Sequence, residues 1–220
     1  MILAIFCPID YKCPQRVLRK IDHLTKNSQL KRLLLVGGSA VVQQSVLSNF
    51  GNMAVLSAEE GTSLATHAII FGDGFELFPR LPNLDSRKIR FIYTPITRVV
   101  NVNRLPENLN TEYMTYVGRG TPFGNPHPIQ ETGSRVKSID FFKYDFERGF
   151  LGDGNIKLLA TQALLGRYLG CSCKPLRCHG DVLAEYLNSI DIDEINSELK
   201  KQCWFYEFGI PICRGSHVRE

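Results

Sequence analysis

The chain has 220 residues, enough for one large domain or two small ones with a buried core. Its 44% hydrophobic and 22% charged residues are ordinary for a soluble globular protein, and no apolar run approaches the roughly 18 to 20 residues of a membrane span. The net charge of +4 suits an anionic ligand but is far from that of a protein that coats DNA, and seven clustered cysteines argue against a secreted disulfide framework.

Up to about Thr94, short apolar runs alternate with segments whose apolar residues recur at helical spacing. The apolar runs cover residues 2–7, 31–36, 53–56, 67–71 and 88–93. The helical segments cover residues 14–24, with Val17, Leu18, Ile21 and Leu24 on one face, and residues 40–50. Continuous apolar strands that alternate with amphipathic helices indicate a parallel sheet covered on both faces.

After Thr94 the pattern changes, because Pro95 interrupts it, and we predict a domain boundary there. Strands are expected over residues 99–102 and 113–117. Ile139, Phe142, Phe146 and Phe150 mark one face of a helix, and further helices are predicted at residues 155–165, 181–187 and 191–201. The aromatic segment at residues 203–208 is expected to pack back on the body or to cover a partner.

Gly37, Gly38 and Ser39 lie between a predicted strand and a predicted helix. Glycines let a ligand approach the backbone, and a helix N-terminus offers free N–H groups and partial positive charge to a phosphate. The segment lacks the lysine of a Walker motif and the full dinucleotide fingerprint. The residues alone therefore leave two interpretations open, an anion-binding turn and a tight structural turn.

Residues 33–40, 67–74 and 89–92 resemble a small Rossmann-like superfamily that includes the cytokinin-activating phosphoribohydrolases and the DNA-processing protein of natural transformation. In that group the glycine turn and a strand ending in Asp-Gly, here Asp73-Gly74, line a pocket for a nucleotide derivative. Enzymatic members carry a longer glycine-rich motif with a catalytic glutamate, and residues 59–62 match only part of it. The resemblance therefore implies ligand binding in this domain rather than glycosidic-bond cleavage.

Residues 118–128 form a second segment of interest, with three glycines and three prolines that fix its shape before any ligand arrives. Gly118 and Gly120 flank Arg119, whose planar guanidinium suits phosphate or carboxylate. Asn125 can both donate and accept hydrogen bonds. Polar residues in rigid loops favour a ligand-binding role over a purely structural one.

Residues 170–181 concentrate cysteines, cations, a histidine and a carboxylate, and the pattern predicts a strand, a reactive turn and a helix. Cys171 and Cys173 are expected on the same face of the strand, with Cys178 and His179 at the start of the helix. Those four residues could hold zinc, although adjacent Cys178 and His179 would have to turn toward one ion.

Two further interpretations of this segment remain open. In one, the cysteines are buried, and Lys174, Arg177 and the helix N-terminus at Asp181 form an anion site. In the other, Cys178 is a nucleophile whose thiolate is favoured by the helix terminus and by its cationic neighbours.

The stretches 98–102, 116–120, 124–126, 169–175 and 178–184 together resemble the domain-of-unknown-function family numbered 4326, which is found in phages, bacteria and some fungi. The resemblance spans about residues 97–188. The combination of Gly-Asn-Pro with Cys-x-Cys-Lys-Pro and Cys-His-Gly-Asp is specific, although Ser172 stands where the family usually has an aromatic residue. It implies a phage or bacterial origin but no established activity.

The sequence thus predicts an α/β protein, with a Rossmann-like domain at residues 1–95 and a small α+β domain at residues 96–220. If the two loops of the second domain converge, they form one polar, cationic pocket. The residues expected to line it are Arg119, Asn125, Lys174, Arg177 and Asp181. There Arg119 and Lys174 would hold the anion, Asn125 would orient the sugar or base, and Asp181 would act as general base or electrostatic stabiliser.

We expect the protein to bind a nucleotide-like or other phosphate-bearing ligand or a nucleobase. Whether it also processes that ligand is left open by the sequence. The alternative is a non-catalytic phage-type protein that binds a host protein or nucleic acid. Catalysis would fall to Asp181, Asn125 and Cys178. No cofactor is expected, with zinc at Cys171, Cys173, Cys178 and His179 as the less favoured interpretation, and the location is expected to be the cytoplasm, that of the host if the protein is viral.

Overall fold

The computed structural model describes residues 1–56, 63–74, 84–85, 88–107 and 109–199. The chain forms two compact units, the first being Met1–Thr94 with the residues from Ile190 on, and the second Pro95–Ser189. The expected domain limits differ from this grouping mainly in the placement of helix α8 (Ile192–Leu199), which belongs to the first unit. The partial glutamate motif at residues 59–62 and the aromatic segment at residues 203–208 lie outside the described residues.

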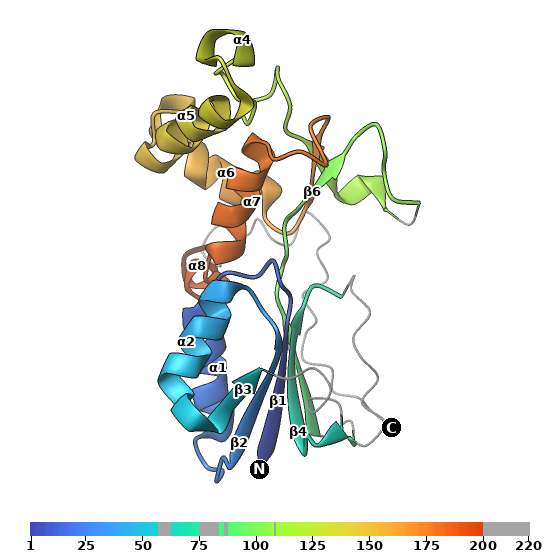
Figure 1. The fold of residues 1–220 in the computed structure, drawn as a ribbon, viewed down its shortest axis with the longest axis vertical. Coiled ribbons are helices and arrows are strands. Elements are labelled where there is room, and N and C mark those ends of the chain that lie inside the picture. Colours follow the sequence, from blue (N-terminus) through green and yellow to red (C-terminus); the bar gives the residue numbers. More distant parts are fainter. Residues whose placement is uncertain (57–62, 75–83, 86–87, 108, 200–220) are drawn as a thin grey trace. The chain divides into compact units, whose positions relative to one another are not determined.

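Five parallel strands form the sheet of the first unit, in the order β3-β2-β1-β4-β5 (Figure 1). The strands are β1 (Ile2–Cys7), β2 (Arg32–Gly37), β3 (Ala54–Leu56), β4 (His67–Gly72) and β5 (Ile89–Tyr93). Ala4 of β1 lies beside Leu34 of β2 on one side and Ala68 of β4 on the other. The predicted α/β, Rossmann-like architecture is confirmed.

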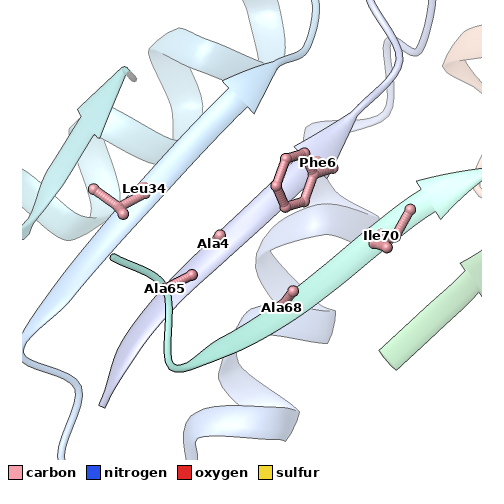
Figure 2. Packing of buried hydrophobic residues seen from close by; sticks show 6 residues of the cluster. All are labelled: Ala4, Phe6, Leu34, Ala65, Ala68 and Ile70. Atoms are coloured by element: carbon pink, nitrogen blue, oxygen red, sulfur yellow. The ribbon is translucent and has the colours of Figure 1, made fainter. Parts of the chain in front are cut away.

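Both faces of this sheet bury apolar side chains, which explains why its strands read as continuous apolar runs. One face carries a cluster that Figure 2 shows on three neighbouring strands and on the segment before β4; it includes Ala4, Phe6, Leu34, Ala65, Ala68 and Ile70. Because successive side chains of a strand alternate, the opposite face receives the intervening buried residues. These are Leu3, Ile5, Leu33, Leu35, Ile69 and Phe71.

Helices α1 (Pro14–Thr25) and α2 (Ala40–Phe50) lie together on one side of the sheet (Figure 1). Pro14 occupies the first turn of α1, where its missing N–H costs no hydrogen bond. The helix predicted from the apolar spacing is confirmed; Val17 and Ile21 are fully buried, whereas Leu24 is 36% exposed. That residue lies in the last turn of α1, where the helix reaches its exposed end.

The second unit contains a three-stranded sheet in the order β6-β8-β7, and both strand pairs are parallel. Its strands are β6 (Arg98–Asn101), β7 (Met114–Tyr116) and β8 (Tyr168–Cys171). Although β8 comes last in the chain, it lies between the other two strands. The expected strand through Cys173 is wrong, because β8 ends at Cys171 and the chain then turns.

Helix α7 (His179–Ser189) is central to the second unit, since it packs against helices α5 and α6 and strands β6 and β8. The other helices are α4 (Ile129–Thr132), α5 (Arg135–Arg148) and α6 (Ile156–Leu164), with short turns η3 (Thr111–Tyr113) and η4 (Gly152–Gly154). Among the described residues, none of the helices has the length and apolarity needed to cross a membrane.

Helix α5 buries Ile139, Phe142 and Phe146, as its apolar spacing predicts. Phe150 was expected on the same face but is 65% exposed. The reason is Gly149, which takes a left-handed conformation with φ of 74° and ends the helix, so the next residue leaves the helical path.

Asn188 in the last helix of the second unit is hydrogen-bonded to Thr97, the residue just before its first strand. Asn188 Oδ1 accepts a hydrogen bond from the Thr97 N–H at 2.7 Å, and its Nδ2 donates to the Thr97 carbonyl at 3.0 Å. Both residues are buried. This reciprocal pair holds α7 in register with β6, and α7 carries several of the candidate site residues.

Helix α8 is joined to α1 by ion pairs centred on Asp193. Its carboxylate Oδ2 lies 3.3 Å from Arg16 Nε, 3.2 Å from Arg19 Nη2 and 2.8 Å from Lys20 Nζ. Burial alone would raise the pKa of Asp193, but the cationic Lys20 and Arg16 side chains beside the carboxylate lower it from 3.8 to about 2.

We predict that replacing Gly37 by alanine destabilises the first unit strongly. Gly37 has φ of 78°, and an added Cβ would lie 2.5 Å from the Cys7 carbonyl oxygen. Steric conflict plus backbone strain should lower the free energy of unfolding by about 2 to 4 kcal/mol in urea titrations. Gly51→Ala is the matched control, since φ there is 53° and, among the described residues, no atom beyond its chain neighbours and its own helix lies within 4 Å of an added Cβ; it should cost about 1 kcal/mol. Equal losses would contradict the contact with Cys7.

We also predict a pH-dependent contribution from Asp193. Because its folded pKa is below its unfolded pKa, the stabilisation is present above about pH 4 and is lost as pH falls toward about 2. The side chain is 31% exposed, so solvent screening limits the effect to about 1 kcal/mol. Urea midpoints of Asp193→Asn and wild type should therefore differ at pH 7 and converge as the pH approaches 2. A constant difference between pH 7 and pH 3 would contradict this assignment; Glu194→Gln, 76% exposed, is the control.

Candidate functional site

The first candidate region is the carboxyl edge of the five-stranded sheet. Strand β1 pairs with β2 on one side and β4 on the other, so the strand order reverses at β1. In open parallel sheets, ligands bind beyond the carboxyl ends of the strands at this point of reversal. The turn at Gly37–Ser39 and the Asp73-Gly74 pair both follow strands at this edge.

The glycine turn is braced against the end of β1. The Gly38 N–H donates to the Cys7 carbonyl at 2.7 Å, and the buried Ser39 hydroxyl donates to the Tyr11 carbonyl at 2.7 Å. Ser39 therefore does not cap helix α2, and the first N–H groups of that helix have no side-chain cap. The structural interpretation of the turn thus accounts for Ser39, while the helix N-terminus keeps donors for an anion.

Tyr11 and Arg16 are two buried residues at this edge that the sequence reasoning missed. Tyr11 is 2% exposed, and its hydroxyl has no hydrogen-bond partner among the described residues. Burial raises the pKa of Tyr11 despite the nearby Arg16 guanidinium. The hydroxyl therefore stays protonated and can donate a hydrogen bond. Its ring stacks against Phe71 of β4, with the ring centroids 6.2 Å apart.

Arg16 is 3% exposed and is held on two of its three nitrogens. Nη1 donates to Thr94 Oγ1 at 3.0 Å and Nη2 to the Tyr93 carbonyl at 3.1 Å. Nε lies at ion-pair distance from Asp193 but lacks the geometry of a hydrogen bond. An aromatic residue in the connection after the first strand, followed by an arginine in the first turn of the next helix, is the signal that could have pointed to this pair.

The second candidate region is the carboxyl edge of the three-stranded sheet. Because β7 and β8 are adjacent and parallel, the loops that follow them leave from the same edge. One loop carries Gly118, Arg119 and Gly120, and the other carries Lys174 and Arg177. Arg119 and Arg177 are exposed, and neither forms an ion pair with another described residue. Their convergence on one ligand stays a prediction.

The Asn125 side chain stabilises the conformation of its own loop through hydrogen bonds. Its Oδ1 accepts from the His127 N–H at 2.9 Å, and its Nδ2 donates to the carbonyl and hydroxyl of Ser138 at 3.1 and 2.9 Å. His127 in turn lies 2.7 Å from Asp145, through its Nε2. The expected orienting role of Asn125 stays a prediction, and these bonds give the residue a structural task as well.

Asp181 and Lys174 form an ion pair within the cysteine-rich segment. The other carboxylate oxygen of Asp181 accepts a hydrogen bond from the Cys178 N–H at 2.8 Å. Such a bond, from the backbone N–H just before a helix to an acidic side chain in its first turn, is typical of a capping box. The backbone carbonyl of Lys174 accepts a hydrogen bond from Asn101 Nδ2. The predicted base and one predicted cation are therefore already partners of one another.

Cys171, Cys178 and His179 gather at the start of α7. The two sulfur atoms and a ring nitrogen of His179 all lie within 4.8 Å of one another, and all three residues are buried. Cys173, the fourth expected ligand, is partly exposed and outside this group. A hydrogen bond from Cys171 lowers the pKa of Cys178 against the opposing effect of burial, and the same bond raises the pKa of Cys171.

His179 is neutral in this setting, because burial lowers its pKa. Its Nε2 lies 2.7 Å from the Val117 carbonyl oxygen, which can only accept, so Nε2 carries the proton. The Nδ1 atom therefore keeps its lone pair. The cluster thus places a thiol of lowered pKa beside a neutral imidazole, which suits nucleophilic chemistry or metal binding.

Comparison with known proteins agrees with both resemblances. The minimal SLOG domain matches residues 1–100, and DUF4326, a domain of unknown function, matches residues 100–189. An uncharacterized 12.4 kDa protein from the nrdA-td intergenic region of Enterobacteria phage T4 is 35% identical over 106 residues, which are 47% of this chain and 96% of the phage protein. No solved structure matches the chain. The chain therefore belongs to the DUF4326 family and carries a minimal SLOG domain ahead of its DUF4326 domain.

Proposed function

We propose that this protein binds a nucleotide-like or other phosphate-bearing small molecule at the carboxyl edge of its five-stranded sheet. SLOG domains are linked to the binding of nucleotide-related ligands, which supports this ligand class. The contacts would come from Tyr11, Arg16 and the turn formed by Gly37, Gly38 and Ser39.

The observation that carries the proposal is the buried Tyr11 hydroxyl, which has no hydrogen-bond partner among the described residues. Beside it, Arg16 Nε faces the Asp193 carboxylate at 3.3 Å without the geometry of a hydrogen bond. Leaving a buried donor unsatisfied costs about 1 to 3 kcal/mol, so such groups persist mainly where a function uses them. A phosphate, carboxylate or base acceptor would satisfy both. The uncapped N-terminus of α2 at the same edge adds backbone donors and partial positive charge.

The loops of the second unit are proposed to contribute to ligand recognition or processing in their own right. Arg119 and Arg177 are the exposed cations there, while Gly118 and Gly120 let a ligand approach the backbone. Lys174 would join them when it leaves Asp181, which would then be free to act as a base. Asn125 and Cys178 complete the proposed catalytic set, Cys178 through its acidic thiol.

We predict that Tyr11→Phe weakens ligand binding without destabilising the fold. The substitution removes a hydroxyl that makes no hydrogen bond within the described part of the chain, so the free energy of unfolding should stay within about 0.5 kcal/mol or rise. Affinity for the nucleotides identified in a thermal-shift screen with AMP, ADP, ATP and ADP-ribose should fall about tenfold by calorimetry.

The control for this experiment is Tyr116→Phe, since Tyr116 is an exposed tyrosine of the second unit. It should leave both stability and affinity unchanged. The absence of a thermal shift with every nucleotide would contradict the proposed function. An unchanged affinity in Tyr11→Phe would remove Tyr11 from the site.

We further predict that Arg119→Ala and Arg177→Ala each lower the affinity for an anionic ligand of the second unit about two- to fivefold, since exposed cations contribute less than about 1 kcal/mol. The loss should shrink at high salt, because these charges are screened. Lys143→Ala, an exposed cation on helix α5, is the control. A loss of the same size in the control would indicate a general charge effect and no defined contact.

A further inference from the structure

We propose that Cys171, Cys178 and His179 bind a single transition-metal ion, zinc being the first candidate, through three protein ligands and one open position. The side chains already converge, because the two sulfur atoms and a histidine ring nitrogen lie within 4.8 Å of one another. A tetrahedral zinc ion with two thiolate ligands places their sulfur atoms about 3.8 Å apart. The two sulfur atoms therefore need to approach one another by about 1 Å at most to reach that separation.

The backbone explains how adjacent residues can face one ion. Cys178 precedes helix α7, and His179 is the first residue inside it, so the chain changes direction between them. Cys171 is the last residue of β8 and reaches the same place from the sheet. Cys178 and His179, although adjacent in the sequence, can therefore turn toward one ion, because the chain changes direction at the start of the helix.

The surroundings fix the ligands in a suitable orientation. The hydrogen bond from His179 Nε2 to the Val117 carbonyl leaves Nδ1 as the metal-binding atom, an arrangement common around metal-bound histidines. The ring also packs against Phe142 in an edge-on contact, with the ring centroids 5.2 Å apart. Gly180 allows the close approach, since a Cβ there would lie 3.4 Å from Cys178 Sγ and 3.2 Å from Val99.

The donor set indicates the class of metal. Two thiolates and one imidazole suit zinc or another soft or borderline ion, and they do not suit magnesium or calcium, which prefer oxygen ligands. Three protein ligands with one open position are typical of catalytic zinc sites, where water or substrate occupies the fourth position. Cys173 lies outside the group, so the proposal assigns it no ligand role.

The test uses the full chain, kept reduced and stripped of metal, and titrated with cobalt(II) as a spectroscopic substitute for zinc. We expect one equivalent to bind, with the visible bands of tetrahedral cobalt and a thiolate-to-cobalt band in the near ultraviolet, all abolished by one equivalent of zinc. Cys171→Ser, Cys178→Ser and His179→Gln should each lose these bands or weaken binding at least about tenfold. Cys173→Ser, the matched control from the same loop, should keep them.

A second measurement on the unaltered protein covers the case in which a variant fails to fold. Zinc should slow alkylation of Cys171 and Cys178 at least about tenfold, as mapped by peptide mass spectrometry, and leave Cys173 unaffected. The proposal is overturned if no cobalt binds, if Cys178→Ser keeps the bands, if Cys173→Ser loses them, or if purified protein contains a Cys171–Cys178 disulfide. Nucleotide binding in the first unit can fail or succeed independently of all these outcomes.

Discussion

Parallel strand pairing is the constraint on which the candidate sites of this protein depend. In both sheets every described pair is parallel, so all strands of a sheet end at one edge. Polar turns that are far apart in the sequence are thereby collected at two carboxyl edges. The apolar faces of the strands supply the stability that allows unsatisfied or reactive groups to persist there.

The two edges collect different chemistry. The carboxyl edge of the first unit holds hydrogen-bond donors, namely the Tyr11 hydroxyl, the Arg16 guanidinium and the start of α2. It therefore suits an acceptor-rich anion. The carboxyl edge of the second unit holds sulfur and imidazole groups beside cations, arranged around the start of α7. The two proposals together, a nucleotide-like ligand at the first edge and a metal ion at the second, would give one chain both recognition and reactive chemistry.

The strands and the special turns could be predicted from the sequence, because continuous apolar runs and glycine-rich turns depend on local composition. The end of β8 was placed wrongly, since the alternation of Cys171 and Cys173 looks like a strand although the ladder with β6 ends at Cys171. The convergence of Cys171, Cys178 and His179 depends on a distant strand and on the exact residue at which α7 begins, which spacing alone does not specify. Tyr11 and Arg16 were missed because their burial results from packing against β4 and β5.

The central claim is that an acceptor on a bound ligand satisfies the buried donors at the carboxyl edge of the first unit. The most direct measurement is the NMR signal of the Arg16 Nε–H group, assigned through an Arg16→Lys variant and followed while AMP or ADP-ribose is added. The account predicts a downfield shift and slower solvent exchange of this proton at ligand saturation. A signal that stays unchanged while the ligand binds would contradict it.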